Sequence, residues 1–384
     1  MGYSAFRPTG LTFHNPAGSV KGYTLVTPMG SNASYLLDMD GRIVHEWRYP
    51  AWRAFYAKLL PSGNLAMLAV DSSMRPPEAP EGRVPTWTET VRRIGGNATH
   101  LVELDWDGSE TWQYENHDMH HDFVRLANGN TLVATFVELP PEVERTVRGG
   151  FRERLMPPMI SDDYLEVDPD GKEVRRVSLW KLLDPRRDPI CPLDRRLEWT
   201  HTNSLDVTAD GSILFSTRQT SRVGLIDTEG KLTWKYGFPD VSHQHHASAL
   251  PNGNVQIFDN GMHRRGNPRS AIVEVNPKDN TVAWQYLANP DIQFFSAHIS
   301  GAERLQGGNV LVCEGAPGRV FEVSNKGEVV WEWVSPFAFR MPDGRINPNI
   351  FRAHRYAPNH PALAGRELDP RKHAATNRMY DLGE

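Results

Sequence analysis

The stretch Leu250-Pro251-Asn252-Gly253-Asn254 decides the fold, because turns of the same kind recur along the chain. An Asn-Gly pair at such a position is typical of a tight turn between two antiparallel strands. Each of these turns is followed by a β-rich run, and four further examples are Ser62-Gly63-Asn64, Asn128-Gly129-Asn130, Asp210-Gly211-Ser212 and Gly307-Gly308-Asn309. The repetition predicts a chain built from copies of one β-unit.

A second turn, most often Asp-Gly, precedes a tryptophan in each unit. The tryptophans marked in this way are Trp47, Trp112, Trp180, Trp234, Trp284 and Trp331. All but Trp180 are followed two residues later by another aromatic side chain, and this period of two is typical of a β-strand. We expect these tryptophans to lie on outer strands and to fill the space between neighbouring units.

The two kinds of turn divide each unit into four short strands, which is the pattern of a β-propeller blade. The tryptophan marks number six, whereas the first kind of turn occurs five times. The first unit supplies three strands, at 23–28, 34–40 and 42–47, and the segment 350–356 can supply the fourth. We therefore predict an all-β, six-bladed propeller whose closing blade is shared by the N- and C-terminal strands, which removes a sheet edge.

The propeller is predicted to form a single domain over residues 1–384. The blades are interrupted by insertions at 71–99, 138–163, 181–198 and 334–349. The first two insertions are expected to govern the choice of substrate, because long loops on a rigid scaffold often carry function.

Composition excludes several classes of partner. The 384 residues carry a net charge of −5, so a basic surface for nucleic acid is not expected. The apolar runs are shorter than a membrane helix requires, and the first residues lack the pattern of a signal peptide. The two cysteines, Cys191 and Cys313, have no metal-type spacing and are expected to be free thiols. A cytoplasmic protein is predicted, or a periplasmic one if a signal peptide has been removed. The composition does not predict an oligomeric state.

Histidines recur at one phase of the repeat. His121 and His245 lie eight residues before the glycine of the following turn, and His201 and His298 lie ten residues before theirs. His354 falls in the segment that closes the ring. Innermost strands line the channel of a propeller, so we expect these five imidazoles to meet at one mouth. Eight histidines lack this phase and are predicted to lie at the surface or beside the site: His14, His45, His100, His117, His243, His263, His360 and His373.

Arg218 follows His201 through one turn and is expected to return to the same mouth on the adjacent strand. A guanidinium beside imidazoles is suited to binding a tetrahedral oxyanion. Asn203 is predicted to orient an imidazole or to bind a substrate oxygen, and Asp122 to fix a histidine tautomer.

Taken together, these motifs resemble those of the bacterial arylsulfate sulfotransferase family. The segments that carry the resemblance are His120-His121-Asp122-Phe123, Trp199-Thr200-His201-Thr202-Asn203-Ser204, Ser216-Thr217-Arg218-Gln219, Gln244-His245 and Phe258-Asp259-Asn260-Gly261. The resemblance implies a six-bladed propeller that transfers a sulfuryl group between phenols through a sulfated histidine.

Matching the family's motifs implies a role for each residue. His245 would be the nucleophile, with His121, His201 and Arg218 around the sulfuryl oxygens. His298 and His354 exceed the set that this mechanism requires, and together with Asn203 they are predicted to contribute to substrate binding. The partner would be a small aromatic molecule, and the reaction would use neither a cofactor nor a metal.

Two other interpretations remain open from the residues alone. His121, His201, His245, His298 and His354 could together bind Fe, Mn, Zn or Cu, which would make the protein a metal-dependent lyase, hydrolase or oxygenase. The third interpretation is a propeller that binds a ligand without catalysis.

Overall fold

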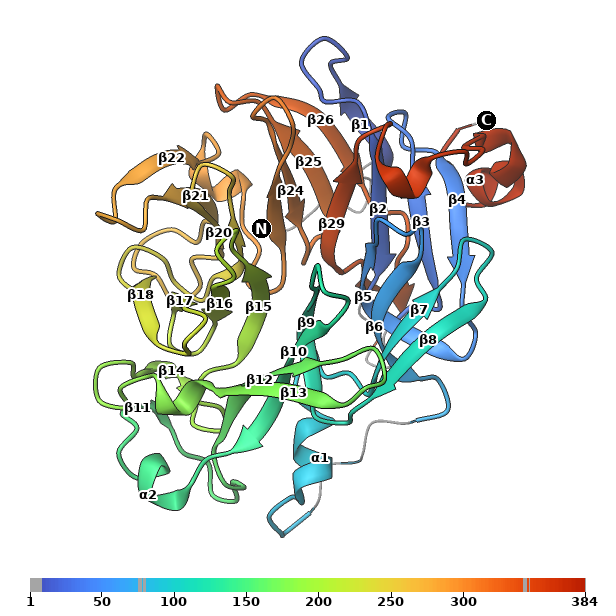
Figure 1. Cartoon of the computed structure of the whole chain (residues 1–384). Helices are drawn as coiled ribbons and strands as arrows, with labels where there is room; N and C mark the ends of the chain where they lie inside the picture. The colour runs from blue at the N-terminus through green and yellow to red at the C-terminus, as the bar shows by residue number, and fades with distance from the viewer. Residues whose placement is uncertain (1–8, 75–77, 79–80, 341–343, 345, 384) are drawn as a thin grey trace.

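Six antiparallel sheets stand around a central axis in the computed structural model, which describes residues 9–74, 78, 81–340, 344 and 346–383 (Figure 1). The prediction of an all-β, six-bladed propeller is confirmed. From the innermost strand outward, the first three blades are β29 (Ile350–Tyr356), β2 (Tyr23–Pro28), β3 (Ala33–Leu37) and β4 (Ile43–Arg48); β5 (Trp52–Leu59), β6 (Leu65–Asp71), β7 (His100–Leu104) and β8 (Glu110–Glu115); and β9 (Met119–Arg125), β10 (Thr131–Glu138), β12 (Ile160–Val167) and β13 (Glu173–Ser178).

The remaining three blades have the same order of strands. They are β15 (Thr202–Val207), β16 (Ile213–Thr217), β17 (Arg222–Ile226) and β18 (Leu232–Gly237); β19 (His245–Ala249), β20 (Val255–Asp259), β21 (Ala271–Val275) and β22 (Val282–Tyr286); and β23 (Gly301–Arg304), β24 (Val310–Glu314), β25 (Arg319–Val323) and β26 (Val329–Val334).

The ring closes through the blade that both ends of the chain share. β29, from the C-terminal part, pairs with β2 in antiparallel register, with His354 opposite Leu25. The structure adds one strand that the repeat does not predict, because β1 (Gly10–His14) pairs with the outer strand β26. The last blade therefore has five strands, and β1 covers what would otherwise be its exposed edge.

The segments between the blades carry short elements of their own. They are α1 (Trp87–Val91), α2 (Pro141–Glu144), β11 (Gly149–Phe151), η1 (Leu179–Lys181), β14 (Ile190–Arg195), η2 (Asp291–Gln293), β27 (Phe339–Arg340) and β28 (Ile346–Asn347), and the chain ends with η3 (Pro361–Leu363), η4 (Pro370–His373) and α3 (Ala374–Met379). Parts of the predicted domain and insertions, at 1–8, 75–77, 79–80, 341–343, 345 and 384, lie outside the described residues. No described helix has the length and apolar character needed to cross a membrane.

Five of the marked tryptophans link each blade to the next. Each donates its indole N–H to the turn between the two outer strands of the neighbouring blade, as Trp47 does to the Asp105 carbonyl at 3.1 Å. The others are Trp112, Trp234, Trp284 and Trp331, bonded to Pro169, Asn280, Asn325 and Met39. Trp180 differs, because it lies in η1 after the outer strand.

β-Bulges interrupt the innermost strands close to the axis. The register shifts at Phe55 in β5, at His121 and Asp122 in β9, at Asn203 in β15 and at His246 in β19. A bulge bends its strand and re-aims the side chains around it. Three of these bulges lie at or within two residues of His121, His201 and His245, whose side chains were predicted to face the channel mouth.

Candidate active site

Three histidines and one arginine from different blades gather at one mouth of the channel. The rings of His121 and His201 lie 4.5 Å apart between centroids. The backbone N–H of Arg218 donates to the His201 carbonyl at 3.0 Å, which brings the arginine back to this mouth. The charge of Arg218 and the ring of His201 both act on His245. The structure thus brings together the four residues predicted to carry the chemistry.

The hydrogen bonds around His245 determine which ring nitrogen carries the proton. Asn260 donates from Nδ2 to the carbonyls of Ser296 and Ile299, at 2.8 and 3.1 Å, so its Oδ1 faces the imidazole. That oxygen lies 2.9 Å from His245 Nδ1, and the His243 carbonyl lies 3.2 Å from the same nitrogen. Both partners are acceptors, so Nδ1 bears the hydrogen and Nε2 of the neutral ring keeps its lone pair.

The environment keeps this ring neutral. Burial lowers the pKa of His245 well below its usual range, and the nearby Arg218 cation lowers it further. Only 2% of the residue is exposed. A neutral imidazole with a free Nε2 is a competent nucleophile.

His201 has a different partner. Its Nδ1 lies 2.6 Å from Oε1 of Glu198, which is three residues earlier and buried. The carboxylate accepts the Nδ1 hydrogen, which leaves Nε2 to exchange a proton with a substrate. His201 itself has φ 58°, a left-handed conformation in which a non-glycine residue is strained.

His121 belongs to a short chain of polar groups. Its Nδ1 lies 2.9 Å from Nδ1 of His120, and His120 Nε2 lies 3.3 Å from Asp162 Oδ1. Burial lowers the pKa of His121 well below its usual range, and the neighbouring His201 adds to the effect. His121 is therefore a neutral group facing the mouth.

Gly96 provides the space in which the His121 ring lies. It adopts φ +77°, and a Cβ added there would lie 2.3 Å from His121 Nε2, well inside contact distance. We expect Gly96→Ala to displace the imidazole and to lower the rate of the reaction at this mouth about 10²-fold, because a small misplacement of an active-site group can lower the rate by that factor. Steady-state kinetics test this, with Gly253→Ala as the matched control, since Gly253 also has a positive φ and nothing lies within 4 Å of an added Cβ there. Equal losses in both variants would contradict the role of Gly96.

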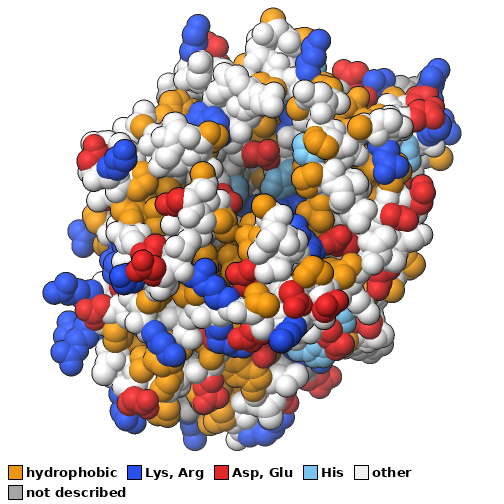
Figure 2. Space-filling model, viewed as in Figure 1, with side chains coloured by type: hydrophobic (Ala, Val, Ile, Leu, Met, Phe, Trp, Pro, Cys, Tyr) orange, Lys and Arg blue, Asp and Glu red, His pale blue; other side chains and the backbone are white. Residues whose placement is uncertain are grey.

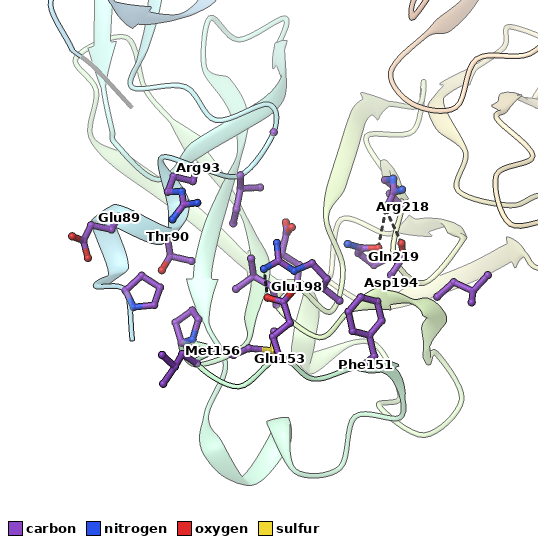
Figure 3. Close-up of a pocket in the computed structure, with 18 of the residues that line it drawn as sticks. Glu89, Thr90, Arg93, Phe151, Glu153, Met156, Asp194, Glu198, Arg218 and Gln219 are labelled. Carbon is purple, nitrogen blue, oxygen red and sulfur yellow. Dashed lines mark hydrogen bonds and ion pairs between the residues drawn. The ribbon is translucent and has the colours of Figure 1, made fainter. Parts of the chain in front are cut away.

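A pocket of about 640 Å³ opens beside this group, and Figure 3 shows Arg218, Gln219 and Asp194 together on one of its sides. Its walls come from three of the loops between strands: 83–95, 151–157 and 193–198. The apolar residues Phe151, Leu155 and Leu193 are exposed around it, whereas Arg83, Arg93 and Arg195 add positive charge. Glu89, Glu153, Asp194 and Glu198 line it as well, and Arg83 and Arg195 pair with Glu89 and Glu153. The apolar rim suits an aromatic group.

Two of the predicted binding residues remain near the mouth. His298 is exposed, with Nε2 3.4 Å from Nδ2 of Asn349. Partial desolvation of its ring lowers its pKa, and the Arg218 cation lowers it further. Asn203 is fully buried and donates to the carbonyl of Gln244 at 2.7 Å, next to His245. Its contact therefore positions the start of β19, and a direct role in substrate binding stays a prediction.

The structure places His354 elsewhere. It is the fifth residue of β29, where Nδ1 lies 3.1 Å from Glu303 and Nε2 lies 3.0 Å from the hydroxyl of Tyr56. It lines a different pocket, with the loop residues that follow β5 and β9 at the other end of the channel. The prediction that His354 lies at the same mouth is wrong.

This position of His354 also separates the five histidines that the metal interpretation requires. Histidine side chains are visible in a hollow near the centre of the face shown in Figure 2. Within the described part of the chain, however, His121, His201, His245, His298 and His354 do not form a group with converging ligand atoms. The predicted ligand set therefore does not assemble at one point.

Asp122 also differs from its prediction. Its carboxylate does not contact an imidazole but accepts hydrogen bonds from Nη1 of Arg352 at 2.7 Å, Nζ of Lys58 at 3.2 Å and the backbone N–H of Leu205 at 3.0 Å. Asp122 and Arg352 are almost completely buried. Arg352 was not predicted from the sequence, and it is the buried partner of Asp122 in an ion-pair cluster that also includes Lys58.

Glu198 and Asn260, which orient the two main imidazoles, were also not singled out for these roles. Glu198 stands three residues before His201, so an acidic residue just ahead of an active-site histidine is a local signal for such a pair. Asn260 is part of the Phe258-Asp259-Asn260-Gly261 motif that carries the family resemblance. Its contact with His245 spans a hairpin, and spacing alone does not reveal it.

A six-bladed β-propeller that gathers histidines and an arginine at one channel mouth defines the class of protein. Within this class, the chain belongs to the arylsulfotransferase (ASST) family, whose model matches residues 90–336. The match covers more than half of the chain and includes His121, His201, Arg218 and His245. The family membership expected from the motifs is confirmed.

Solved structures support the fold only. A protein of unknown function from Bacteroides caccae is 15% identical, with a TM-score of 0.54 over 87% of this chain and 98% of that chain. A virginiamycin B lyase from Staphylococcus aureus is 13% identical, with a TM-score of 0.46 over 85% of this chain and 84% of that chain. No curated protein sequence matches this chain.

Proposed function

We propose that this protein transfers a sulfuryl group from an aryl sulfate to a phenol through a covalent intermediate on His245. The observation that carries the proposal is the orientation of His245, whose Nδ1–H is held by Asn260 while Nε2 keeps a lone pair. Membership of the arylsulfotransferase (ASST) family supports the same reaction class.

In the first step, Nε2 of His245 attacks the sulfur atom of the aryl sulfate. The nitrogen–sulfur bond forms as the sulfur–oxygen bond to the aryl group breaks, and the departing oxygen keeps the electron pair. His201, paired with Glu198, donates a proton to that oxygen. The imidazole of His245 then carries a positive charge, which the Asn260 oxygen and the His243 carbonyl stabilise through Nδ1–H.

In the second step, a phenol takes the place of the product. His201 accepts the phenolic proton as the oxygen attacks sulfur, and the nitrogen–sulfur bond returns its electron pair to Nε2 of His245. The group in transfer is a trigonal sulfuryl whose negative charge is spread over three oxygens, so Arg218 stabilises it electrostatically. Each proton donated in the first step is recovered in the second.

The mouth pocket fits the aromatic part of the substrate. Phe151, Leu155 and Leu193 are apolar and exposed at its rim, a cluster of the kind that commonly marks a ligand site. Arg93, which is exposed at this pocket, offers a cation for the sulfate on its way to Arg218. The substrate class that follows is a small aromatic sulfate with a phenolic acceptor.

The test of this proposal is detection of the intermediate. The protein is exposed to 4-nitrophenyl sulfate without an acceptor, and its intact mass is measured after rapid mixing. We expect one added sulfuryl group on the peptide that contains His245, which disappears when a phenol is added. Release of nitrophenol with no adduct at His245 under these conditions would overturn the proposal.

Arg218 is expected to contribute through its planar fork as well as its charge. Arg218→Lys keeps the charge but loses paired N–H groups, so we expect kcat to fall about 10²-fold with a smaller change in KM. Steady-state kinetics with an aryl sulfate measure both. Arg187→Lys, at a position that is 86% exposed, is the control and should retain full activity. A change confined to KM would show that Arg218 binds the ground state only.

A further inference from the structure

A second cluster of chemically active side chains lies beside the mouth pocket. The ligand atoms of Cys191, Asp194, His243 and His263 all lie within 4.8 Å of one another. Cys191 and Asp194 come from β14, His243 precedes β19 and His263 follows β20. The sequence analysis assigned none of them a function. In the ranges that the structure describes, no other His, Cys, Asp and Glu side chains gather in this way.

The spacing of the donor atoms is close to that of a tetrahedral metal site. Cys191 Sγ lies 3.3 Å from His263 Nδ1, and His263 Nδ1 lies 4.0 Å from Asp194 Oδ1. Zinc bonds of about 2.0–2.3 Å place neighbouring ligand atoms roughly 3.5 Å apart. The ligands would need to move by less than about 1 Å to enclose one ion.

His243 faces the Asp194 carboxylate directly. Its Nε2 lies 2.6 Å from Oδ2 of Asp194, and its Nδ1 lies 3.1 Å from the Ser242 hydroxyl, which donates to the Met262 carbonyl at 2.6 Å. The ring nitrogen nearest the carboxylate is therefore directed into the cluster, as a ligand of a shared ion would be.

The geometry does not fit a cysteine-based catalytic triad. In a triad the histidine uses one ring nitrogen for the nucleophile and the other for the carboxylate. In this cluster the thiol of Cys191 and the carboxylate of Asp194 both face Nδ1 of His263. Approach of a thiol and a carboxylate to a single ring nitrogen is the arrangement of ligands around a shared ion.

Backbone strain supports a built site. His243 and His263 have φ values of 53° and 61°, in the left-handed region that non-glycine residues avoid. Such conformations are strained and persist where their surroundings impose them.

We propose that Cys191, Asp194, His243 and His263 form a tetrahedral site for a divalent transition metal of the Zn²⁺ class, tying the β14 segment to the fifth blade. Thiolate and imidazole ligands favour Zn²⁺ over hard cations. Binding releases the Cys191 proton, and the thiolate and carboxylate then neutralise the ion. Arg218, which lies 3.5 Å from Asp194 Oδ1 (Figure 3), thus faces a neutral complex. The site adjoins the mouth pocket, because Asp194 lies beside Arg218 and the His243 carbonyl faces His245, but the ion itself takes no part in the steps of sulfuryl transfer.

The experiment uses the full chain, purified without a histidine tag and stripped of metal with a chelator. Titration with Co²⁺ should give a saturable signal at one ion per chain, with visible bands of tetrahedral cobalt and a thiolate-to-cobalt charge-transfer band in the near ultraviolet. Zn²⁺ should abolish both. A wild-type protein that shows no charge-transfer band with Co²⁺ would overturn the proposal.

Variants locate the ion. Cys191→Ser should lose the charge-transfer band, and His263→Ala should weaken Co²⁺ binding by about tenfold or more, since loss of an outer partner alone costs that much. Cys313→Ser and His117→Ala are matched controls at positions outside the cluster, and each should keep the band. Persistence of the band in Cys191→Ser would disprove the assignment.

A further measurement on the wild-type chain does not depend on variant folding. Cys191 is half-buried, whereas Cys313 is buried. We expect saturating Zn²⁺ to slow alkylation of Cys191 by iodoacetamide at least about tenfold, as followed by peptide mass spectrometry. An unchanged rate would count against the site, even if Zn²⁺ binds elsewhere.

Discussion

Replacement of His245 by alanine is expected to lower kcat/KM for sulfuryl transfer by at least about 10³-fold, because the nucleophile of a covalent mechanism has no substitute at its position. The other imidazoles at the mouth do not replace it. Nδ1 of His121 faces another imidazole, that of His120, and His201, whose Nδ1 is held by Glu198, is the group that donates and accepts the substrate proton in this mechanism. Nitrophenol release from 4-nitrophenyl sulfate in the presence of a phenol measures the loss.

The same variant should also fail to form the adduct detected by intact mass. His117→Ala is the control, because His117 is on the surface, where it pairs with Glu115, and we expect full activity and a normal adduct. Circular dichroism should show that both variants are folded. An adduct of unchanged yield in His245→Ala would place the nucleophile on another residue and would contradict the mechanism.

The propeller could be predicted from sequence because each blade repeats its turns and its tryptophan. Those turns also set the phase of His121, His201, His245 and His298, since each of their strands runs into a turn from which residues can be counted. His354 has no such reference. Its strand β29 is not joined to β2 by a hairpin, because the two come from opposite ends of the chain. The position of His354 along its strand could therefore not be counted from a turn, and the structure places it near the far end of the channel.

Contacts between blades could not be predicted from the sequence. Asp122 and Arg352 are 230 residues apart in the chain, and no local pattern connects them. The cluster of Cys191, Asp194, His243 and His263 has the same character, because its two histidines lie outside the regular strands and outside the repeat. Repeats predict positions that all blades share, whereas these groups depend on loops and irregular segments that differ from blade to blade.

Asp122→Asn is expected to lower the free energy of unfolding by about 3–5 kcal/mol, the usual cost of removing one partner from a buried ion pair. The substitution leaves the Arg352 guanidinium, which is 2% exposed, and the Lys58 ammonium without their carboxylate. Chemical denaturation followed by tryptophan fluorescence measures the loss. Asp107→Asn, on an exposed turn, is the control and should change stability by less than about 0.5 kcal/mol.

The loss should depend on pH in a direction that the charges determine. Burial alone would raise the pKa of Asp122, but Arg352 and Lys58 outweigh it and lower the pKa to about 2 from an unperturbed 3.8. A carboxyl whose pKa is lower in the folded state stabilises the protein above its unfolded pKa, and this stabilisation is lost as the pH falls through the folded pKa. The difference between wild type and Asp122→Asn should therefore shrink by about 2 kcal/mol between about pH 4 and pH 2. A difference that stays constant over this window would mean that packing, and not the charge of Asp122, holds the axis together.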